Sequence, residues 1–253
     1  MNVDYFDLHG KKYLLAGASS GIGRKTAEML SRMGAQVILL ARREELLKTV
    51  LAGLAGTGHS YYAIDLSVLD KIESLMKTIV SEQGALDGLV YCSGMGDSRP
   101  VKMANPEFVQ KMMTINFLAF YEMVRCITKR GRFNPGMSIV GLSSCAAIDP
   151  AKSQSVYSAS KAAMDAAVQV MAQEYADKGI RVNTIRPGMV RTAMYQIVLD
   201  DIGEEFNEDF NKKQFLGVGE TEDIANMIAF LLSPLSKFAT GAHFSIDGGN
   251  TCH

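Results

Sequence analysis

A tyrosine and a lysine stand four positions apart in the stretch SVYSASKAAM (155–164), with only small side chains between them. Four positions make about one helical turn, so a helix here puts the side chains of Tyr157 and Lys161 on one face. One interpretation is an exposed tyrosine stacked on a lysine stem. The other is chemical, because a neighbouring ammonium group can make the proton of a phenol mobile. The choice depends on whether the rest of the chain supplies a cofactor site and a substrate site.

A glycine-rich loop lies between a short apolar run and a helical pattern near the start of the chain. In AGASSGIGRKTAEML, the three glycines have the spacing G-x-x-x-G-x-G. Glycine lets the backbone approach a pyrophosphate, and the free N–H groups of a helix N-terminus favour phosphate. Any strand-to-helix turn can need glycine, but this strand–loop–helix context is the one that dinucleotide binding requires. The predicted contacts are Gly17, Ser19, Ser20, Gly21, Ile22 and Gly23.

The end of the second apolar run indicates which dinucleotide binds. NAD sites carry an acidic residue about 20 positions after the loop, which binds the ribose 2′-hydroxyl. In VILLARREEL that position is Ala41, and Arg42 and Arg43 follow it. A guanidinium can hold a 2′-phosphate with two hydrogen bonds, which favours NADP(H) over NAD(H). The alternative is that both arginines only pair with acids such as Glu44 and Glu45.

Short apolar runs alternate with longer helical patterns along the chain. Strands are expected at 12–17, 36–41, 60–65, 86–91, 137–143, 180–185 and 242–247, and helices at 21–35, 43–55, 68–83, 105–130, 155–177 and 220–233. Repeated β-α-β units with right-handed crossovers predict an α/β fold, a Rossmann-type doubly wound parallel sheet flanked by helices on both faces. We expect one catalytic domain over 1–253. Asp65, at the end of the third strand, could accept a hydrogen bond from the adenine amino group.

Residues 189–218 do not fit this rhythm, because they carry many charges with phenylalanines among them. One interpretation is a pair of solvated surface helices. The other is a substrate lid over the mouth of the sheet, which we favour because the segment follows the end of a strand, where such folds bind ligands.

Composition narrows the class of protein. The 253 residues carry a formal net charge of −1, so no charge excess favours nucleic acid or an anionic membrane as a partner. The longest apolar runs are far shorter than a membrane span, and the N-terminal residues lack a signal-peptide core. The four cysteines match no zinc spacing and no disulfide framework. We therefore expect a cytoplasmic protein without a metal.

The motifs together resemble the short-chain dehydrogenase/reductase family over nearly the whole chain. Ser144 precedes Tyr157 by 13 positions, as in the family pattern. The overall length and the C-terminal sequence look like those of the single-domain 3-oxoacyl-carrier-protein reductases. The matching pieces are GASSGIG (17–23), DL (65–66), Asn116 in TINFLAF, Ser144 in GLSSCAA, YSASK (157–161), RPGMVRT (186–192) and DGG (247–249).

The resemblance implies a catalytic tetrad of Asn116, Ser144, Tyr157 and Lys161. Tyr157 would be the general acid for carbonyl reduction, or the base for alcohol oxidation, and Lys161 would lower its pKa from about 10. Ser144 would hydrogen-bond the substrate oxygen, and Asn116 would hold a water that links Lys161 to solvent. The implied cofactor contacts are Tyr157, Lys161, Leu66, Ser93, Gly94, Pro187, Gly188, Val190 and Thr192, with Arg42, Arg43 and Asp65 as above.

The chain departs from the family at two places. Ala16 stands where the family usually has threonine, and YCSG (91–94) stands where it usually has Asn-Asn-Ala-Gly. Tyr91 and Cys92 replace two amides that help to fix the central sheet, so the local hydrogen bonding must differ.

The expected function is an NADP(H)-dependent oxidoreductase that moves hydride between nicotinamide and a carbonyl or alcohol substrate. We favour an NADPH-dependent carbonyl reductase acting on a small carbonyl or sugar-like compound. The alternative is a catalytically silent NADP(H)-binding scaffold or regulatory protein. The resemblance also implies a homotetramer or homodimer that associates through the helices at 105–130 and 155–177.

Overall fold

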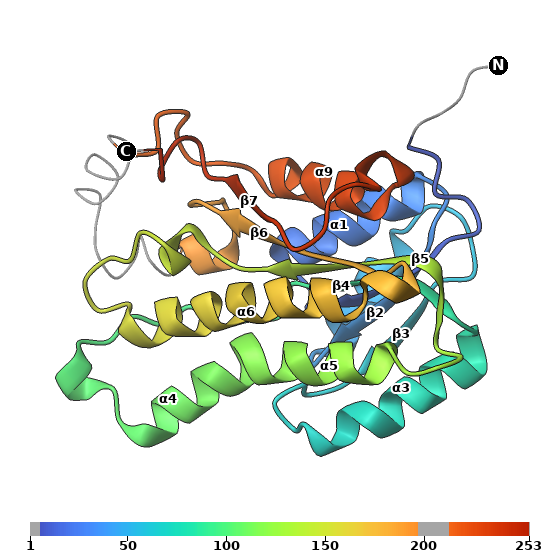
Figure 1. Cartoon of the computed structure of the whole chain (residues 1–253), viewed down its shortest axis with the longest axis horizontal. Helices are drawn as coiled ribbons and strands as arrows, with labels where there is room; N and C mark the ends of the chain where they lie inside the picture. The colour runs from blue at the N-terminus through green and yellow to red at the C-terminus, as the bar shows by residue number, and fades with distance from the viewer. Residues whose placement is uncertain (1–5, 197–212, 253) are drawn as a thin grey trace.

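A seven-stranded parallel sheet forms the centre of the computed structural model, which describes residues 6–196 and 213–252 (Figure 1). The strand order is β3-β2-β1-β4-β5-β6-β7, and every neighbouring pair is parallel. This order reverses between β1 and β4, and such a switch point is where doubly wound sheets bind ligands. The strands are β1 (Lys12–Ala16), β2 (Gln36–Ala41), β3 (Ser60–Ala63), β4 (Leu86–Tyr91), β5 (Phe133–Leu142), β6 (Arg181–Pro187) and β7 (His243–Ile246).

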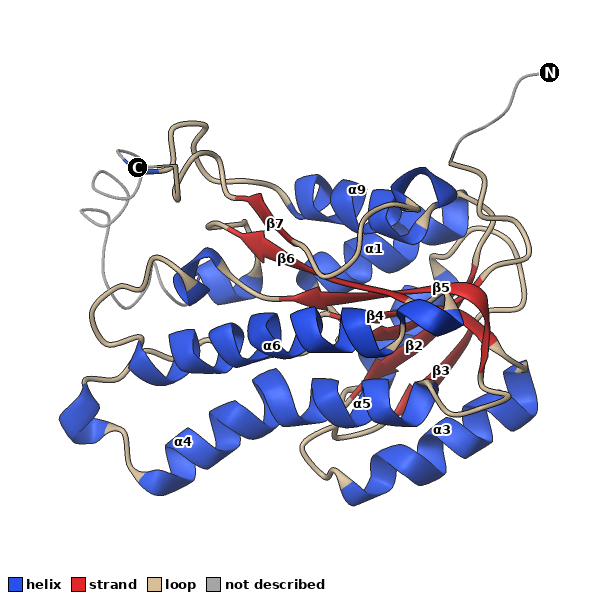
Figure 2. Ribbon diagram, viewed as in Figure 1, coloured by secondary structure: helices blue, strands red, loops and turns tan. Residues whose placement is uncertain are grey.

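Helices cover both faces of the sheet, as the ribbon in Figure 2 shows. One face packs against α1 (Gly21–Arg32), α2 (Glu44–Ala52) and α9 (Thr221–Leu232). The other face packs against α3 (Asp70–Gln83), α5 (Ala119–Ile127) and α6 (Ser155–Glu174), and α4 (Pro106–Met113) runs beside α6. The central strands are buried on both faces, which explains their nearly continuous apolar sequences. The Rossmann-type fold that the sequence predicts is confirmed.

Side chains cap the N-termini of α4 and α9. Asn105 caps α4, where its side-chain oxygen accepts a hydrogen bond from the Phe108 N–H at 3.0 Å and Pro106 occupies the first turn. Glu220 and Asp223 form a reciprocal capping box at the start of α9. Short 3₁₀ helices lie at Val101–Met103, Cys145–Ala147, Ala176–Lys178 and Pro234–Ser236.

The single helix expected at 105–130 is interrupted. A π-helical turn at Thr114–Leu118 separates α4 from α5. Hydrophobic periodicity could not predict this turn, because one inserted residue changes the hydrogen-bond ladder without ending the helical pattern. β5 also begins at Phe133 rather than at the expected residue 137, because its first residues pair with the start of β4.

The predicted lid at 189–218 lies largely outside the described residues. Val190, near the start of this segment, and Gly219, directly after its end, form a parallel β-bridge. Across the described part of the chain, no helix combines the length and apolarity needed to cross a bilayer, and no group of three or more potential ligands could hold a metal ion.

Candidate active site

Tyr157 and Lys161 lie on the first two turns of α6, as their spacing predicts. The Lys161 ammonium is 5.8 Å from the centre of the Tyr157 ring and donates a hydrogen bond of 2.7 Å to the carbonyl of Leu142, the last residue of β5. The lysine is 4% exposed, and burial lowers its pKa to about 8. Buried lysines with a lowered pKa are common at functional sites, because catalysis uses groups that titrate near the working pH.

Ser144 lies beside the Tyr157 hydroxyl. It starts the short 3₁₀ helix after β5, and its Oγ accepts a hydrogen bond from the Ala146 N–H at 3.2 Å. Burial raises the pKa of Tyr157, and the hydrogen bond with Ser144 lowers it by a smaller amount. The expected lowering by Lys161 is therefore not observed with these side chains. The cost of burying the phenolate is larger, and the lysine donates to Leu142.

Asn116 lies inside the π-helical turn and is fully buried. Its Oδ1 accepts from the Met95 N–H at 2.8 Å, and its Nδ2 donates to the Met95 carbonyl at 3.0 Å and to Ser160 Oγ at 2.9 Å. A Cβ atom placed on Gly94 would lie 3.1 Å from the Asn116 Oδ1 and 3.6 Å from the Lys161 Nζ. The structure thus brings all four tetrad residues to one end of the sheet, together with the YCSG stretch.

The glycine-rich loop lies against this end of the sheet. A Cβ atom on Gly17 would come within 2.7 Å of the Ser93 nitrogen, and one on Gly23 within 2.3 Å of the Gly17 carbonyl oxygen. Any side chain at these two positions would therefore collide with backbone. The loop passes beside Ser93 and Gly94 at the end of β4, next to Asn116.

Arg43, the second of the two arginines after β2, contacts the glycine-rich loop. The Arg43 Nη2 donates hydrogen bonds of 3.1 Å to both Ser19 Oγ and Ser20 Oγ. The carboxylates of Glu44 and Glu45, which the alternative interpretation assigned to the arginines, pair with Lys48 at 3.2 Å and 2.8 Å.

Asp65 follows β3, and its own loop holds its carboxylate in place. Its carboxylate accepts hydrogen bonds from the Ser67 hydroxyl at 2.7 Å and the Ser67 N–H at 3.0 Å. These bonds lower the pKa of Asp65, with a smaller contribution from Arg42.

Two of the predicted cofactor contacts have apolar side chains that pack into the protein. Leu66 packs into the core with α3 and α5. Ile22 lies partly buried against α9. Guanidinium groups and hydroxyls beside a glycine-rich loop form a donor set that fits a phosphorylated dinucleotide.

The segment after β6 crosses toward the same loop. Pro187 ends β6, and a Cβ atom on Gly21 would lie 3.4 Å from the Thr192 methyl group. Buried Gln214 brackets this segment, because it accepts from the Met189 N–H at 2.9 Å and donates to the Met189 carbonyl at 3.1 Å. Gly188 touches the same glutamine side chain. Thr192 therefore lies beside the glycine-rich loop, whereas Val190 is buried in the core cluster that α9 covers and Gly188 packs against Gln214 and Asp247.

Sequence reasoning missed three contributors to this arrangement, namely the Leu142 carbonyl, the Met95 backbone and Gln214. Backbone groups carry no residue signal, so the first two have no sequence signature. Ser160 was visible only as one of the small residues inside YSASK, although it bonds both Asn116 and the Tyr157 carbonyl.

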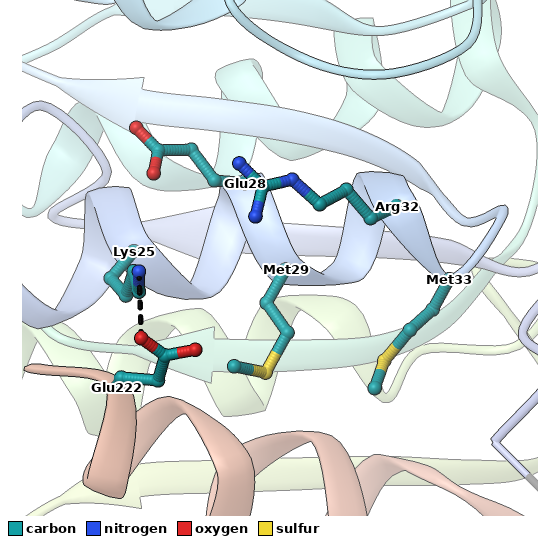
Figure 3. A pocket seen from close by; sticks show the side chains of 6 residues that line it. All are labelled: Lys25, Glu28, Met29, Arg32, Met33 and Glu222. Atoms are coloured by element: carbon teal, nitrogen blue, oxygen red, sulfur yellow. Dashed lines mark ion pairs between the residues drawn. The ribbon is translucent and has the colours of Figure 1, made fainter.

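A surface pocket lies elsewhere, between α1 and α9 (Figure 3). Lys25 on α1 and Glu222 on α9 form an ion pair of 3.0 Å across it. None of the predicted site residues lines this pocket, so it is not the candidate active site. Its lining residues are Lys25, Glu28, Met29, Arg32, Met33 and Glu222.

Fold and site together define a nicotinamide-dependent oxidoreductase of the Rossmann type. A family model described as enoyl-(acyl carrier protein) reductase matches residues 17–251. The chain belongs to the short-chain dehydrogenase/reductase family.

Several curated relatives match the chain over nearly its whole length. It is 34% identical to glucose 1-dehydrogenase of Gluconobacter oxydans over 96% of this chain and 93% of that protein. It is 32% identical to the 3-oxoacyl-(acyl-carrier-protein) reductase of Rickettsia felis, over 96% and 98% of the two chains. These relatives differ in the substrates that their names give, so the family resemblance alone does not fix a substrate.

Solved structures give the same result. A dehydrogenase/reductase from Sinorhizobium meliloti superposes with a TM-score of 0.88 at 30% identity, covering 98% of this chain and 97% of that one. A short-chain dehydrogenase from Burkholderia cenocepacia, solved in complex with NADP, has a TM-score of 0.89 at 26% identity over 96% and 99% of the chains.

Proposed function

We propose that this protein reduces a small carbonyl compound with NADPH and that Tyr157 is the general acid. The observation that carries the proposal is the meeting of Tyr157, Ser144, Lys161 and Asn116 beside the glycine-rich loop, at the carboxyl ends of the strands. A nicotinamide bound there supplies a hydride for the carbonyl carbon. The protein must then supply a proton to the carbonyl oxygen.

Tyr157 donates that proton. Its raised pKa keeps the phenol protonated at neutral pH, which suits an acid waiting for a carbonyl oxygen. The Ser144 hydroxyl, next to the phenol, donates a hydrogen bond to the oxygen on which negative charge develops. Lys161 holds the ribose of the cofactor and stabilises the phenolate that remains after the transfer.

Asn116 acts by positioning in this proposal. Its amide braces the Met95 backbone against Ser160, so that the loop after β4 stays in register with α6. The water-mediated relay from Lys161 to solvent remains a prediction. The side-chain amide of Asn116 bonds Met95 and Ser160, so these bonds give no support for the relay.

The preference for NADPH rests on Arg43 and Arg42. The Arg43 guanidinium lies on the hydroxyls of the loop that would hold the pyrophosphate, and the charge of Arg42 helps to lower the pKa of Asp65. A 2′-phosphate between them would gain two positively charged partners. The relative solved with NADP supports this choice.

The test is the variant Tyr157→Phe, measured by NADPH oxidation over a panel of ketones and aldehydes. Loss of the acid lowers kcat by about 10²–10⁴-fold, while NADPH binding followed by fluorescence stays unchanged. Turnover equal to wild type in the variant would refute the role of Tyr157. Tight NADPH binding without turnover of any carbonyl by the wild type would favour the scaffold alternative.

A further inference from the structure

Tyr91, the last residue of β4, is fully buried at the position where the family usually has an amide side chain. Its hydroxyl donates a hydrogen bond of 2.5 Å to the carbonyl of Ile115. Its ring contacts the edge of Phe120 on α5, with the ring centres 5.5 Å apart. Tyr91 therefore connects the central strand of the sheet to the helix segment that carries Asn116.

Ile115 lies in the π-helical turn at Thr114–Leu118. A π turn shifts the backbone hydrogen-bond ladder by one residue, and a side chain that inserts a donor at such a turn can satisfy the displaced carbonyl. The same turn directs Asn116 into the interior, where its amide bonds the Met95 backbone and Ser160. Ser160 directly precedes Lys161 on α6.

We propose that Tyr91 is a positioning residue of the active site: its hydroxyl holds the π turn through the Ile115 carbonyl and so fixes Asn116 against Met95 and Ser160. This inference rests on the proposed function. It adds a residue that touches neither the substrate nor the cofactor and acts only through Asn116. The departure YCSG then keeps the link between β4 and the Asn116 turn by means of a phenol.

Burial makes this phenol a constant donor. The pKa of Tyr91 is raised far above its ordinary value by burial, so the hydroxyl keeps its proton at every pH at which the protein works. An unpaired backbone carbonyl in a buried site is unfavourable, so removal of the hydroxyl should allow the turn to relax toward an ordinary helix.

The chain offers a matched control. Tyr13 on β1 is also buried, its pKa is also raised by burial, and its hydroxyl also donates to a backbone carbonyl, that of Leu232 at 3.4 Å. This bond lies on the opposite face of the sheet, against α9. Tyr13→Phe therefore removes the same chemical group at a site unconnected with Asn116.

The experiment compares Tyr91→Phe with Tyr13→Phe. We expect Tyr91→Phe to lower kcat by about ten- to a hundredfold, because small misplacements of a site are costly, while KM for NADPH stays within about twofold. Tyr13→Phe should keep kcat. Hydrogen exchange of the Met95 amide, which bonds Asn116, should accelerate at least about tenfold in Tyr91→Phe alone.

The outcomes separate this inference from the proposed function. Equal kcat and equal Met95 exchange in the two variants would overturn the role of Tyr91, and a loss of turnover in Tyr157→Phe would leave the proposed function intact. Faster Met95 exchange with an unchanged kcat would also overturn it, since Tyr91 would then be only structural. If Tyr157→Phe keeps full turnover, the proposed function fails, and Met95 exchange alone decides whether Tyr91 holds the turn.

Discussion

At the scale of single residues, burial controls the chemistry of the site. Tyr157 and Lys161 are both shifted toward their neutral forms, the phenol by a raised pKa and the ammonium by a lowered one. A negatively charged group bound nearby would stabilise the charged form of Lys161 and would accept a hydrogen bond from the phenol of Tyr157. A phosphorylated cofactor and a developing oxyanion are both groups of this kind.

Lys161 should make the stability of the protein depend on pH. Its pKa falls from 10.5 to about 8 on folding, so the unfolded chain binds more protons between these values and stability rises with pH. In urea unfolding, the stability of wild type relative to Lys161→Met should increase progressively from about pH 8 to about pH 10. The difference should change by about 2–3 kcal/mol in favour of wild type. A difference that stays constant over this range would contradict a lowered pKa.

Arg43 should discriminate between the two nicotinamide cofactors. Arg43→Ala removes the guanidinium that the proposal places at the 2′-phosphate, so KM for NADPH should rise about tenfold or more, while KM for NADH, which lacks that phosphate, should change by much less. Arg24→Ala is the control. Arg24 lies on α1, the helix that follows the loop, but its guanidinium pairs with Glu28 at 2.8 Å. Equal losses for both cofactors would remove Arg43 from the 2′-phosphate site.

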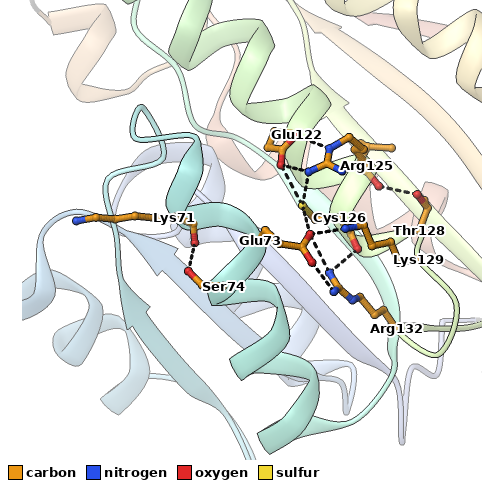
Figure 4. Close-up of polar contacts among 10 residues, drawn as sticks. Lys71, Glu73, Ser74, Glu122, Arg125, Cys126, Thr128, Lys129 and Arg132 are labelled. Atoms are coloured by element: carbon orange, nitrogen blue, oxygen red, sulfur yellow. Dashed lines mark hydrogen bonds and ion pairs between the residues drawn. The ribbon is translucent and has the colours of Figure 1, made fainter.

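At the scale of elements, a charged network joins α3 to α5 and to the loop between α5 and β5 (Figure 4). Glu73 on α3 pairs with Arg132 at 2.7 Å and Lys129 at 2.8 Å, and accepts a hydrogen bond from the Cys126 thiol at 3.0 Å. Arg132 is the main reason why the pKa of Glu73 lies far below its usual range. Burial raises the pKa of Cys126 to about 12, so this cysteine stays a thiol.

Glu73→Gln should reduce the free energy of unfolding by about 0.5–1 kcal/mol at neutral pH, because partly exposed ion pairs contribute little each. The folded-state pKa is depressed, so this stability is present above the unfolded value near 4.5 and is lost as the pH falls below it. Thermal unfolding at neutral and acidic pH measures the effect. Glu222→Gln, which breaks the exposed pair with Lys25, is the control and should leave stability unchanged. If Glu73→Gln destabilised the protein more at acidic than at neutral pH, the depressed pKa of Glu73 would be contradicted.

At the scale of the whole molecule, the sequence predicted the sheet well and the π turn not at all. Apolar strands and helical periodicity are repeated signals, so the seven strands lie where they were expected within a few residues. Helical spacing predicted that Tyr157 and Lys161 share one face of α6, and the family resemblance implied that Ser144 meets them. The π turn is a local change of the helical ladder that leaves the apolar periodicity intact, and the Tyr91 hydrogen bond joins residues 24 positions apart, for which one sequence carries no signal.

Association into a homotetramer or homodimer remains a prediction. The helices named for it, α4 to α5 and α6, bury their apolar stripes in the core in part, and Val170 and Tyr121 remain exposed on them. All four tetrad residues come from one chain, so the proposed site needs no residue from a second copy.

The pairing of β1 with β4 has a consequence for how the protein forms. The ribosome delivers β1 long before β4, and the two strands are joined only after β2 and β3 have been made. The tight approach of Gly17 to Ser93 crosses this seam. Pairings of such long range close slowly, because the loop entropy is lost before the contacts form. The approach of Gly17 to Ser93 therefore cannot form before β4 has been made, and a nascent chain that holds only its first βαβ unit still lacks this part of the proposed cofactor site.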